Sequence, residues 1–167
     1  MTLDHDPSAA PSTVRTASLL YVIHGVLRLV NAVVLLVLLP QTIAIAQRVA
    51  TSQLQGRSTG GVDVGAVATG TAIGATVFSV LLGLTIGVLT IVFARKLLRG
   101  RNWARIVLLV FAVLALPGLV GFGGAGGVLV GLLSLVSSLA AIVGAVLTFL
   151  PASNPWFRRR DRAVPGV

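Results

Sequence analysis

The chain has 167 residues, of which 56% are hydrophobic and only 10% are charged, and its mean hydropathy is +1.00. Soluble domains are usually about a quarter charged, so this composition excludes a water-soluble globular protein. The absence of cysteine excludes disulfides, thiolate catalysis, zinc–thiolate sites and iron–sulfur clusters.

The first predicted element is a long apolar helix near the N-terminus. Residues 1–16 are polar and contain two prolines, so we expect them to form a disordered tail. Residues 17–46 are mostly apolar, and Pro40 predicts a kink among them. A helix of this length exceeds a hydrocarbon core of ~30 Å, so it is expected to tilt or protrude.

An alternative for this segment is a cleaved signal peptide. Ala44-Ile45-Ala46 has the small-x-small pattern of a cleavage site after an apolar run. Cleavage there would leave three spans and place the mature N-terminus outside.

Three further apolar segments follow along the chain. Arg95 and Lys96 end the second, Pro117-Gly118 marks a kink or end in the third, and Pro151 stops the fourth. The sequence therefore predicts an all-α membrane protein, a four-transmembrane-helix bundle within residues 17–150. The predicted spans are residues 17–46, 65–94, 104–122 and 128–150, with spans three and four forming a close hairpin.

The basic residues predict the orientation of these spans. The formal net charge is +9, and most of the positive charge falls before span one, between spans two and three, or after span four. These residues are Arg15, Arg95, Lys96, Arg99, Arg101, Arg105, Arg158, Arg159, Arg160 and Arg162. Because positive loops stay in the cytoplasm, both termini are expected there, with residues 151–167 a basic cytoplasmic tail. Membrane topology thus explains the charge, and no nucleic acid partner is expected.

The predicted cytoplasmic ends carry candidate interfacial anchors. Trp103 and Trp156 fall at these ends, where indole rings prefer the headgroup level. Arg101, Arg105 and Arg158 lie beside them and are expected to contact anionic lipid headgroups. Alternatively, these arginines act only as a topology signal. The preference for Arg over Lys, with abundant Ala, Gly and Val, is typical of a GC-rich bacterial genome, so we expect a bacterial cell membrane.

Arg28 is the candidate functional residue of the first span. It shares a helix face with His24 and Asn31, at spacings of four and three residues. A charge at mid-bilayer costs ~2.5–3.5 kcal/mol on insertion scales, so this position indicates contact with a lipid headgroup, an anion or a partner subunit. The alternatives are that Arg28 extends along its own helix to the cytoplasmic headgroups, or that it serves transport. No Asp or Glu lies in any predicted span, which excludes an internal ion pair there.

Small residues recur on one face of spans two and four. Such residues let helix backbones approach closely in a membrane. The pattern indicates either packing of spans two and four against each other or a docking face for a second copy or another subunit. The candidate packing residues are Gly83, Gly87, Gly127, Gly131, Ser134, Ser138 and Ala141.

Other motifs give little support for chemistry. Residues 121–126 match G-x-G-x-x-G, but neither the preceding strand nor the following acidic residue of a dinucleotide site is present. Asp4-His5-Asp6 lies in the predicted tail, which preorganises no metal site. The only acids are Asp4, Asp6, Asp63 and Asp161, all outside the spans, so we expect no catalytic residue, metal or cofactor.

Two short motifs resemble a known class of proteins. Gly100-Arg101-Asn102-Trp103-Ala104-Arg105 opens span three, and the segment from Leu150 to Phe157, LPASNPWF, closes span four. Over residues 90–160 the chain is similar to small four-helix integral membrane proteins of high-GC Gram-positive bacteria, a class without an assigned activity. The resemblance implies a topology and no mechanism.

These features favour a non-enzymatic membrane protein, either an accessory or structural subunit or a homo-oligomer that packs through its small-residue helix faces. The alternative is a small membrane transporter or channel component.

Overall fold

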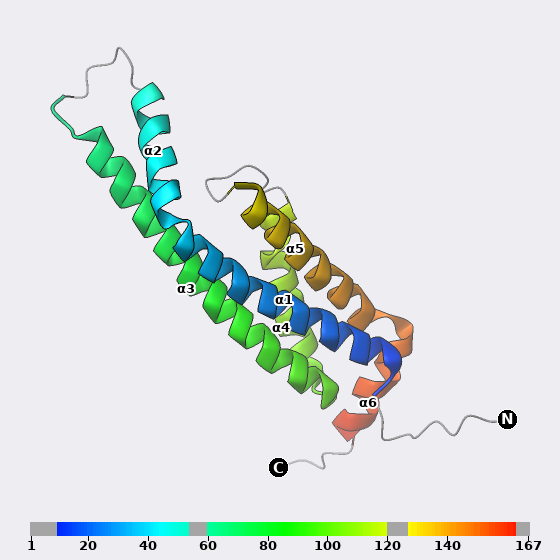
Figure 1. Ribbon diagram of the computed structural model, residues 1–167. Helices are drawn as coiled ribbons and strands as arrows, with labels where there is room; N and C mark the ends of the chain where they lie inside the picture. The colour runs from blue at the N-terminus through cyan, green and yellow to red at the C-terminus, as the bar shows by residue number, and fades with distance from the viewer. Residues whose placement is uncertain (1–9, 54–59, 120–126, 163–167) are drawn as a thin grey trace.

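The computed structural model describes residues 10–53, 60–119 and 127–162, and every element in these ranges is helical (Figure 1). The elements are α1 (Ser12–Val37), α2 (Leu39–Gln53), α3 (Val64–Leu98), α4 (Asn102–Leu114), the 3-10 turn η1 (Leu116–Leu119), α5 (Gly127–Phe149), the 3-10 turn η2 (Pro151–Ser153) and α6 (Asn154–Arg162).

Three of the described helices, α1, α3 and α5, are long and apolar enough to cross a membrane. The predicted all-α fold and membrane-spanning helices are therefore confirmed at this level. The third predicted span differs, because α4 has only 13 residues and ends at Leu114. Pro117 has no N–H for the next helical hydrogen bond, and the Gly118 N–H instead donates to the Ala115 carbonyl in a 3-10 turn, at 3.0 Å. A fourth crossing stays a prediction.

The first predicted span is divided near Pro40, as its sequence indicates. α1 ends at Val37 and α2 begins at Leu39. Pro40 lies in the first turn of α2, where a missing N–H breaks no helical hydrogen bond. The helical segment is longer than expected at both ends: α1 begins at Ser12, within the predicted tail, and α2 continues to Gln53.

The helices form an antiparallel bundle in which α1 packs against both α3 and α5 (Figure 1). The start of α1 lies beside the end of α3, where the Ser18 hydroxyl donates to the Ala94 carbonyl at 3.0 Å. The start of α1 also meets η2, where the hydroxyls of Ser153 and Thr13 are hydrogen-bonded at 3.0 Å. α4 completes the bundle by packing against α3 and α5.

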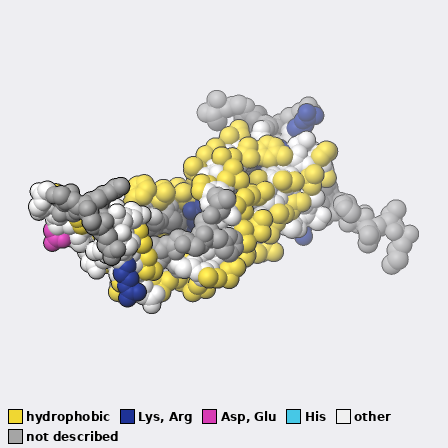
Figure 2. Space-filling model, turned by 90° about the horizontal axis from the view of Figure 1, so that it is seen from above, with side chains coloured by type: hydrophobic (Ala, Val, Ile, Leu, Met, Phe, Trp, Pro, Cys, Tyr) yellow, Lys and Arg dark blue, Asp and Glu magenta, His cyan; other side chains and the backbone are white. Residues whose placement is uncertain are grey.

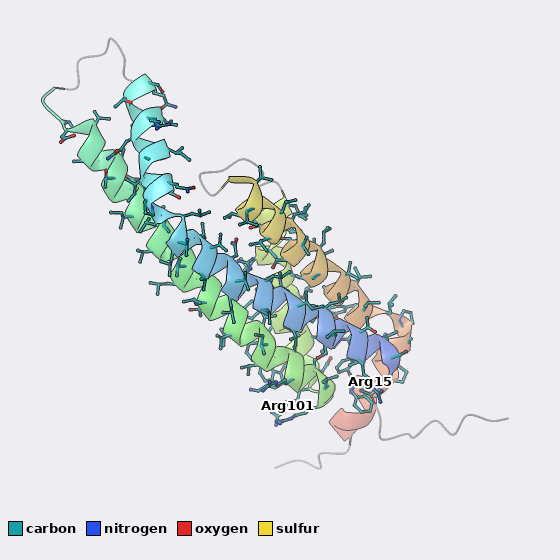
Figure 3. The ribbon with its side chains drawn as sticks, in the orientation of Figure 1. Arg15 and Arg101 are labelled. Carbon is teal, nitrogen blue, oxygen red and sulfur yellow. The ribbon has the colours of Figure 1, made fainter. Side chains whose placement is uncertain are left out.

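The bundle has two unlike ends. Arg15 and Arg101 lie at the same end (Figure 3), together with the other basic residues of the α3–α4 turn and of α6, and we call this the basic end. At the opposite end, α2 and the first half of α3 extend beyond α5 as a pair of helices (Figure 1). We call this pair, residues 39–53 and 64–79, the α2–α3 arm. At 1.5 Å per residue, α3 is ~52 Å long and α5 only ~35 Å.

The distribution of side chains suits a lipid environment. The hydrophobic core of the described residues combines six alanines with larger side chains such as Tyr21, Leu97 and Phe157. Leu, Val, Ile and Phe side chains point outward along all the main helices, and apolar surface covers much of the face in Figure 2. Close backbone packing with large apolar groups outside is the arrangement by which membrane helices associate.

Candidate functional site

The crossing of α1 and α3 depends on glycine. A Cβ on Gly25 would lie 2.8 Å from the Gly87 carbonyl oxygen and 2.6 Å from Ile91 Cγ1. A Cβ on Gly87 would lie 3.1 Å from the Gly25 carbonyl oxygen, and one on Gly83 would lie 4.0 Å from Ala32 Cβ. The candidate packing residues Gly83 and Gly87 therefore pack against α1.

The small residues of α5 face elements other than α3. Ala141 is fully buried in the core, and the nearby Gly144 approaches Tyr21 of α1. The expectation that spans two and four pack against each other is replaced by a different arrangement, in which α3 and α5 each use small residues to pack against α1. The sequence pattern identifies such a face but not its partner.

The remaining candidate packing residues lie near the arm end of α5. Gly131 is buried and Ser134 is half-buried. Ser138 is buried and its hydroxyl donates to the Ala115 carbonyl at 2.7 Å. Gly127 is different, because it is exposed, has φ of +69° and opens α5, with nothing within 4 Å of a Cβ built on it. A glycine suits this position because of the positive φ, not because of helix packing.

His24 joins α1 to α5. Its ring is fully buried, and Nδ1 lies 2.8 Å from both the carbonyl oxygen and the hydroxyl of Ser137. A carbonyl oxygen only accepts, so Nδ1 carries a proton and donates to it. The Ser137 hydroxyl is 3.3 Å from the His24 carbonyl, to which it donates. With its proton held in this way, Nδ1 cannot act as a base toward Ser137, and the pair fixes the position of the two helices.

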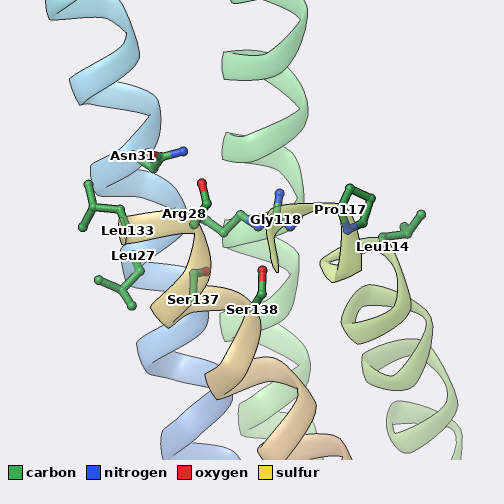
Figure 4. A pocket seen from close by; sticks show the side chains of 10 residues that line it. Leu27, Arg28, Asn31, Leu114, Pro117, Gly118, Leu133, Ser137 and Ser138 are labelled. Atoms are coloured by element: carbon green, nitrogen blue, oxygen red, sulfur yellow. The ribbon is translucent and has the colours of Figure 1, made fainter. Parts of the chain in front are cut away.

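Arg28 lies one helical turn beyond His24 and lines a pocket of about 150 Å³ between α1, η1 and α5. Figure 4 shows its side chain extending from α1 toward Pro117 and Gly118, past Ser137 and Ser138. Asn31 lines the same pocket, so the structure brings Arg28 and Asn31 together, with His24 bonded to the adjoining α5 wall. The other lining residues are Leu27, Leu114, Leu133 and Ser134.

The break after α4 shapes one wall of this pocket. The Ala115 carbonyl accepts from Gly118 N at 3.0 Å and from the Ser138 hydroxyl at 2.7 Å. A Cβ on Gly118 would collide with the same hydroxyl. Ser138 therefore adds a second hydrogen bond to the Ala115 carbonyl and holds the turn against α5.

The position of Arg28 argues against one alternative from the sequence. Arg28 is the seventeenth of the 26 residues of α1, which places it ~24 Å from the helix start at the basic end. Its side chain extends toward the helix break, not toward the basic residues (Figure 4). Contact with headgroups at the basic end, expected from a helix starting at residue 17, does not fit this geometry.

The predicted interfacial anchors lie at the basic end, but they differ in exposure. Arg101 and Arg158 are exposed, and Trp103 is 42% exposed. The Trp103 ring packs edge-on against Phe93 at 5.3 Å, and Lys96 Nζ lies 5.0 Å from its centre. In contrast, Trp156 is only 5% exposed and belongs to the core, so it presents little surface to lipid.

Arg105 also differs from the expected headgroup contact. It is 7% exposed, and its guanidinium carbon lies 4.6 Å from the Phe149 ring centre and 4.4 Å from that of Phe157. Its Nη2 donates to Asn154 Oδ1 at 3.2 Å. Arg105 therefore joins α4 to α5 and α6 through cation–π and hydrogen-bond contacts.

Sequence reasoning missed several residues of these contacts. Ser137 is distinguished from the neighbouring serines only by its contact with His24. The two residues are 113 positions apart, and no sequence pattern pairs them. Phe149 and Phe157 carry no charge or spacing that points to Arg105. Pro117-Gly118 was the one visible signal, because it predicts an interruption, although not the pocket beside it.

Two sequence features lie outside the described residues, namely Asp4-His5-Asp6 and the glycine-rich match at 121–126. The possible cleavage site at Ala44-Ile45-Ala46 falls within α2. No protein family, curated protein or solved structure matches this chain. The resemblance described above stays a prediction, and function must be argued from the site and the surface.

Proposed function

We propose that the protein is a non-enzymatic structural or accessory component of a bacterial cell membrane that assembles through its α2–α3 arm. The proposal includes four crossings, made by α1, α3, α4 with η1, and α5, and places both termini in the cytoplasm. The charge distribution supports this orientation, because basic residues gather at the basic end, whereas Arg48 lies on the arm.

The observation that carries the proposal is the length of the arm. α3 is ~52 Å long, and a hydrocarbon core is ~30 Å thick. Immersing all of α3 would require a tilt of about 55°, beyond the usual range for membrane helices. We therefore infer that part of the arm projects past the lipid, with exposed apolar side chains such as Val49 (47%) and Val67 (57%). Apolar surface outside lipid favours coverage by protein.

The arm has a groove suited to a helix. A hollow of about 800 Å³ runs between α2 and α3 and is lined mainly by small side chains, including Ala46, Ala50, Ala72, Ala75 and Thr76. Small side chains permit close approach of another helix backbone.

We assign this groove to the arm of a second copy of the chain. The small side chains that line the groove let an identical arm approach closely. Closed symmetric pairs are also the commonest oligomers.

Single cysteines test this assembly, because the chain has none of its own. Ala75→Cys places a thiol in the groove, and Val110→Cys places one on the outer face of α4, which is 50% exposed there. A short bifunctional maleimide should link Ala75→Cys protein in lipid nanodiscs into a dimer and leave Val110→Cys monomeric. Native mass spectrometry of the unmodified protein in mild detergent should give twice the 17.2 kDa chain mass.

The outcomes separate the possible occupants of the groove. A monomer in both measurements contradicts assembly through the arm. Cross-linking of Ala75→Cys in native membranes to a different protein would replace the second copy by a partner subunit.

Orientation has its own test. Reporter tags fused near residues 56 and 98 should report opposite faces of the membrane, with residue 98 in the cytoplasm. The same face at both positions would contradict the proposed topology, including the crossing formed by α3.

A small transporter or channel component is the second candidate, and the pocket at Arg28 favours it. Purified protein in liposomes would then support solute flux that Arg28→Leu abolishes. If the wild-type protein supports no flux and Arg28→Leu only loses a bound partner, the structural role is favoured.

A further inference from the structure

Arg28 has no carboxylate within reach among the described residues. The sequence contains no Asp or Glu between residues 7 and 62 or between residues 64 and 160. Asp63 opens α3, where its Oδ1 accepts from Ala66 N at 3.0 Å. Arg28 instead lies beside Gly83 and Gly87 of α3, ~30 Å or more along the helix from Asp63. The helices around Arg28 therefore supply no counter-ion for its guanidinium.

The pocket lies deep in the bundle, toward the arm end. Ser134 of α5, which lines it, is seven residues after Gly127 and fifteen before Phe149. These separations correspond to ~10 Å from the arm end of α5 and ~23 Å from its basic end. An anion that enters here therefore comes from the side opposite the arginine-rich loops.

The lining of the pocket supplies hydrogen-bond donors around the guanidinium. Arg28 offers five N–H groups in a planar fork, and Ser134 adds a half-buried hydroxyl. Asn31 adds an amide whose Oδ1 is buried and has no partner among the described residues. Because rotation of the amide exchanges its oxygen and nitrogen, Asn31 can present N–H donors to the same space. A volume of about 150 Å³ accommodates one small anionic group.

From this arrangement we propose that the Arg28 pocket binds one phosphate group, either the headgroup phosphate of an anionic phospholipid or free inorganic phosphate. The planar guanidinium of Arg28 can donate two parallel hydrogen bonds to two oxygens of one phosphate group. Asn31 and Ser134 then donate to the remaining oxygens. This site is separate from the arm groove and does not depend on oligomer formation.

Binding is tested with purified protein, Arg28→Gln and the control Arg48→Gln, whose arginine is exposed on α2. One arm measures thermal stabilisation by inorganic phosphate against sodium chloride of equal ionic strength. The other measures phosphatidylglycerol adducts by native mass spectrometry. We expect wild type and Arg48→Gln to bind alike, and Arg28→Gln to bind at least ~10-fold more weakly.

The two arms distinguish the sources of the phosphate. A response to phosphatidylglycerol alone assigns the pocket to a lipid headgroup, and a response to inorganic phosphate assigns it to a free ion. If wild type and Arg28→Gln respond equally to both probes, or if neither responds to either, the proposal is overturned.

Asn31→Asp keeps the proposal testable if Arg28→Gln fails to fold. This near-isosteric change places a carboxylate three residues from Arg28 on the same helix face. The internal ion pair should raise the melting temperature of ligand-free protein and reduce phosphate or lipid binding at least ~10-fold. Wild-type affinity in Asn31→Asp would show that phosphate does not occupy this pocket.

Discussion

At the basic end, α1 is enclosed by α3, α5 and the segment that includes α6, whereas at the arm end α2 packs against α3 with an open groove between them. At the basic end, the buried hydroxyls of Ser18 and Ser153 donate to the Ala94 and Leu147 carbonyls. Toward the arm end, Asn31 Oδ1 is buried without a described partner, and no described carboxylate reaches Arg28. The difference indicates that the basic end stabilises the fold and that the arm end is available for ligands and partners.

The same glycine spacing serves both regions with different results. Gly83 and Gly87 are four residues apart and lie against α1, while a Cβ built on Gly70 or Gly74, which have the same spacing, meets no described atom within 4 Å. A GxxxG pair therefore predicts a close approach only where a second helix is present, so the exposed pair is the one that identifies a free surface.

The largest effect should come from filling the closest helix crossing. In Gly25→Ala, the new methyl group meets the Gly87 carbonyl oxygen, which cannot move without shifting α3. Overpacking of this kind costs ~1–3 kcal/mol, which outweighs the helix propensity gained by alanine. Chemical unfolding in detergent micelles should show this loss.

Gly74→Ala is the matched control for this change, because its Cβ meets nothing. Its monomer should keep or gain stability, by up to ~1 kcal/mol from helix propensity. Equal losses in both variants would mean that the arm is as closely packed as the bundle.

A smaller effect is expected at Arg105, the buried counterpart of Arg28. In Arg105→Leu, the contacts with the Phe149 and Phe157 rings and the hydrogen bond to Asn154 are lost. Cation–π contacts contribute ~0.5–2 kcal/mol each depending on exposure, so unfolding free energy should fall by about 1–2 kcal/mol. Arg105→Lys should recover part of this, because lysine keeps the charge without the planar stacking group.

Arg28→Leu should behave in the opposite way in ligand-free protein. It removes an arginine that has no internal counter-ion, so stability should stay unchanged or rise. A fall in stability as large as that of Arg105→Leu would show that Arg28 is satisfied within the chain and would remove the contrast between the two ends.

Much of this contrast follows from local sequence, and part of it does not. Runs of apolar residues predict the three long helices, and Pro40 and Pro117 predict the two interruptions, because these properties depend on neighbouring residues alone. Trp156 shows the limit: its position beside Arg158 predicts an interfacial ring, yet α6 folds back so that the ring joins the core. Burial depends on how distant helices pack, which local pattern does not encode.

The candidate site divides in the same way. The face shared by His24, Arg28 and Asn31 follows from helical periodicity, and the lack of acidic residues is visible in the chain. The pocket requires Gly118 and Ser138 to meet across a helix break, and Arg28 extends toward that break because the pocket lies there. Both are tertiary properties.

The smallest expected effect concerns the boundary between the two regions, at Ser137. Ser137→Ala removes a hydroxyl that lies 2.8 Å from His24 Nδ1 and donates to the His24 carbonyl, but leaves the backbone carbonyl to accept from the ring. Side-chain hydrogen bonds between membrane helices contribute ~0.6 kcal/mol on average and at most ~1.7, so a loss in that range is expected from equilibrium unfolding.

Ser134→Ala, one turn toward the arm end, provides the comparison for Ser137→Ala. No described residue accepts a hydrogen bond from Ser134, which lines the pocket, so its removal should leave the ligand-free stability unchanged and weaken phosphate binding instead. Equal stability losses in the two variants would place the boundary of the closed bundle beyond Ser134, and Arg28 would then belong to the structural core. A loss confined to Ser137→Ala fixes the boundary at His24, one turn before the pocket begins.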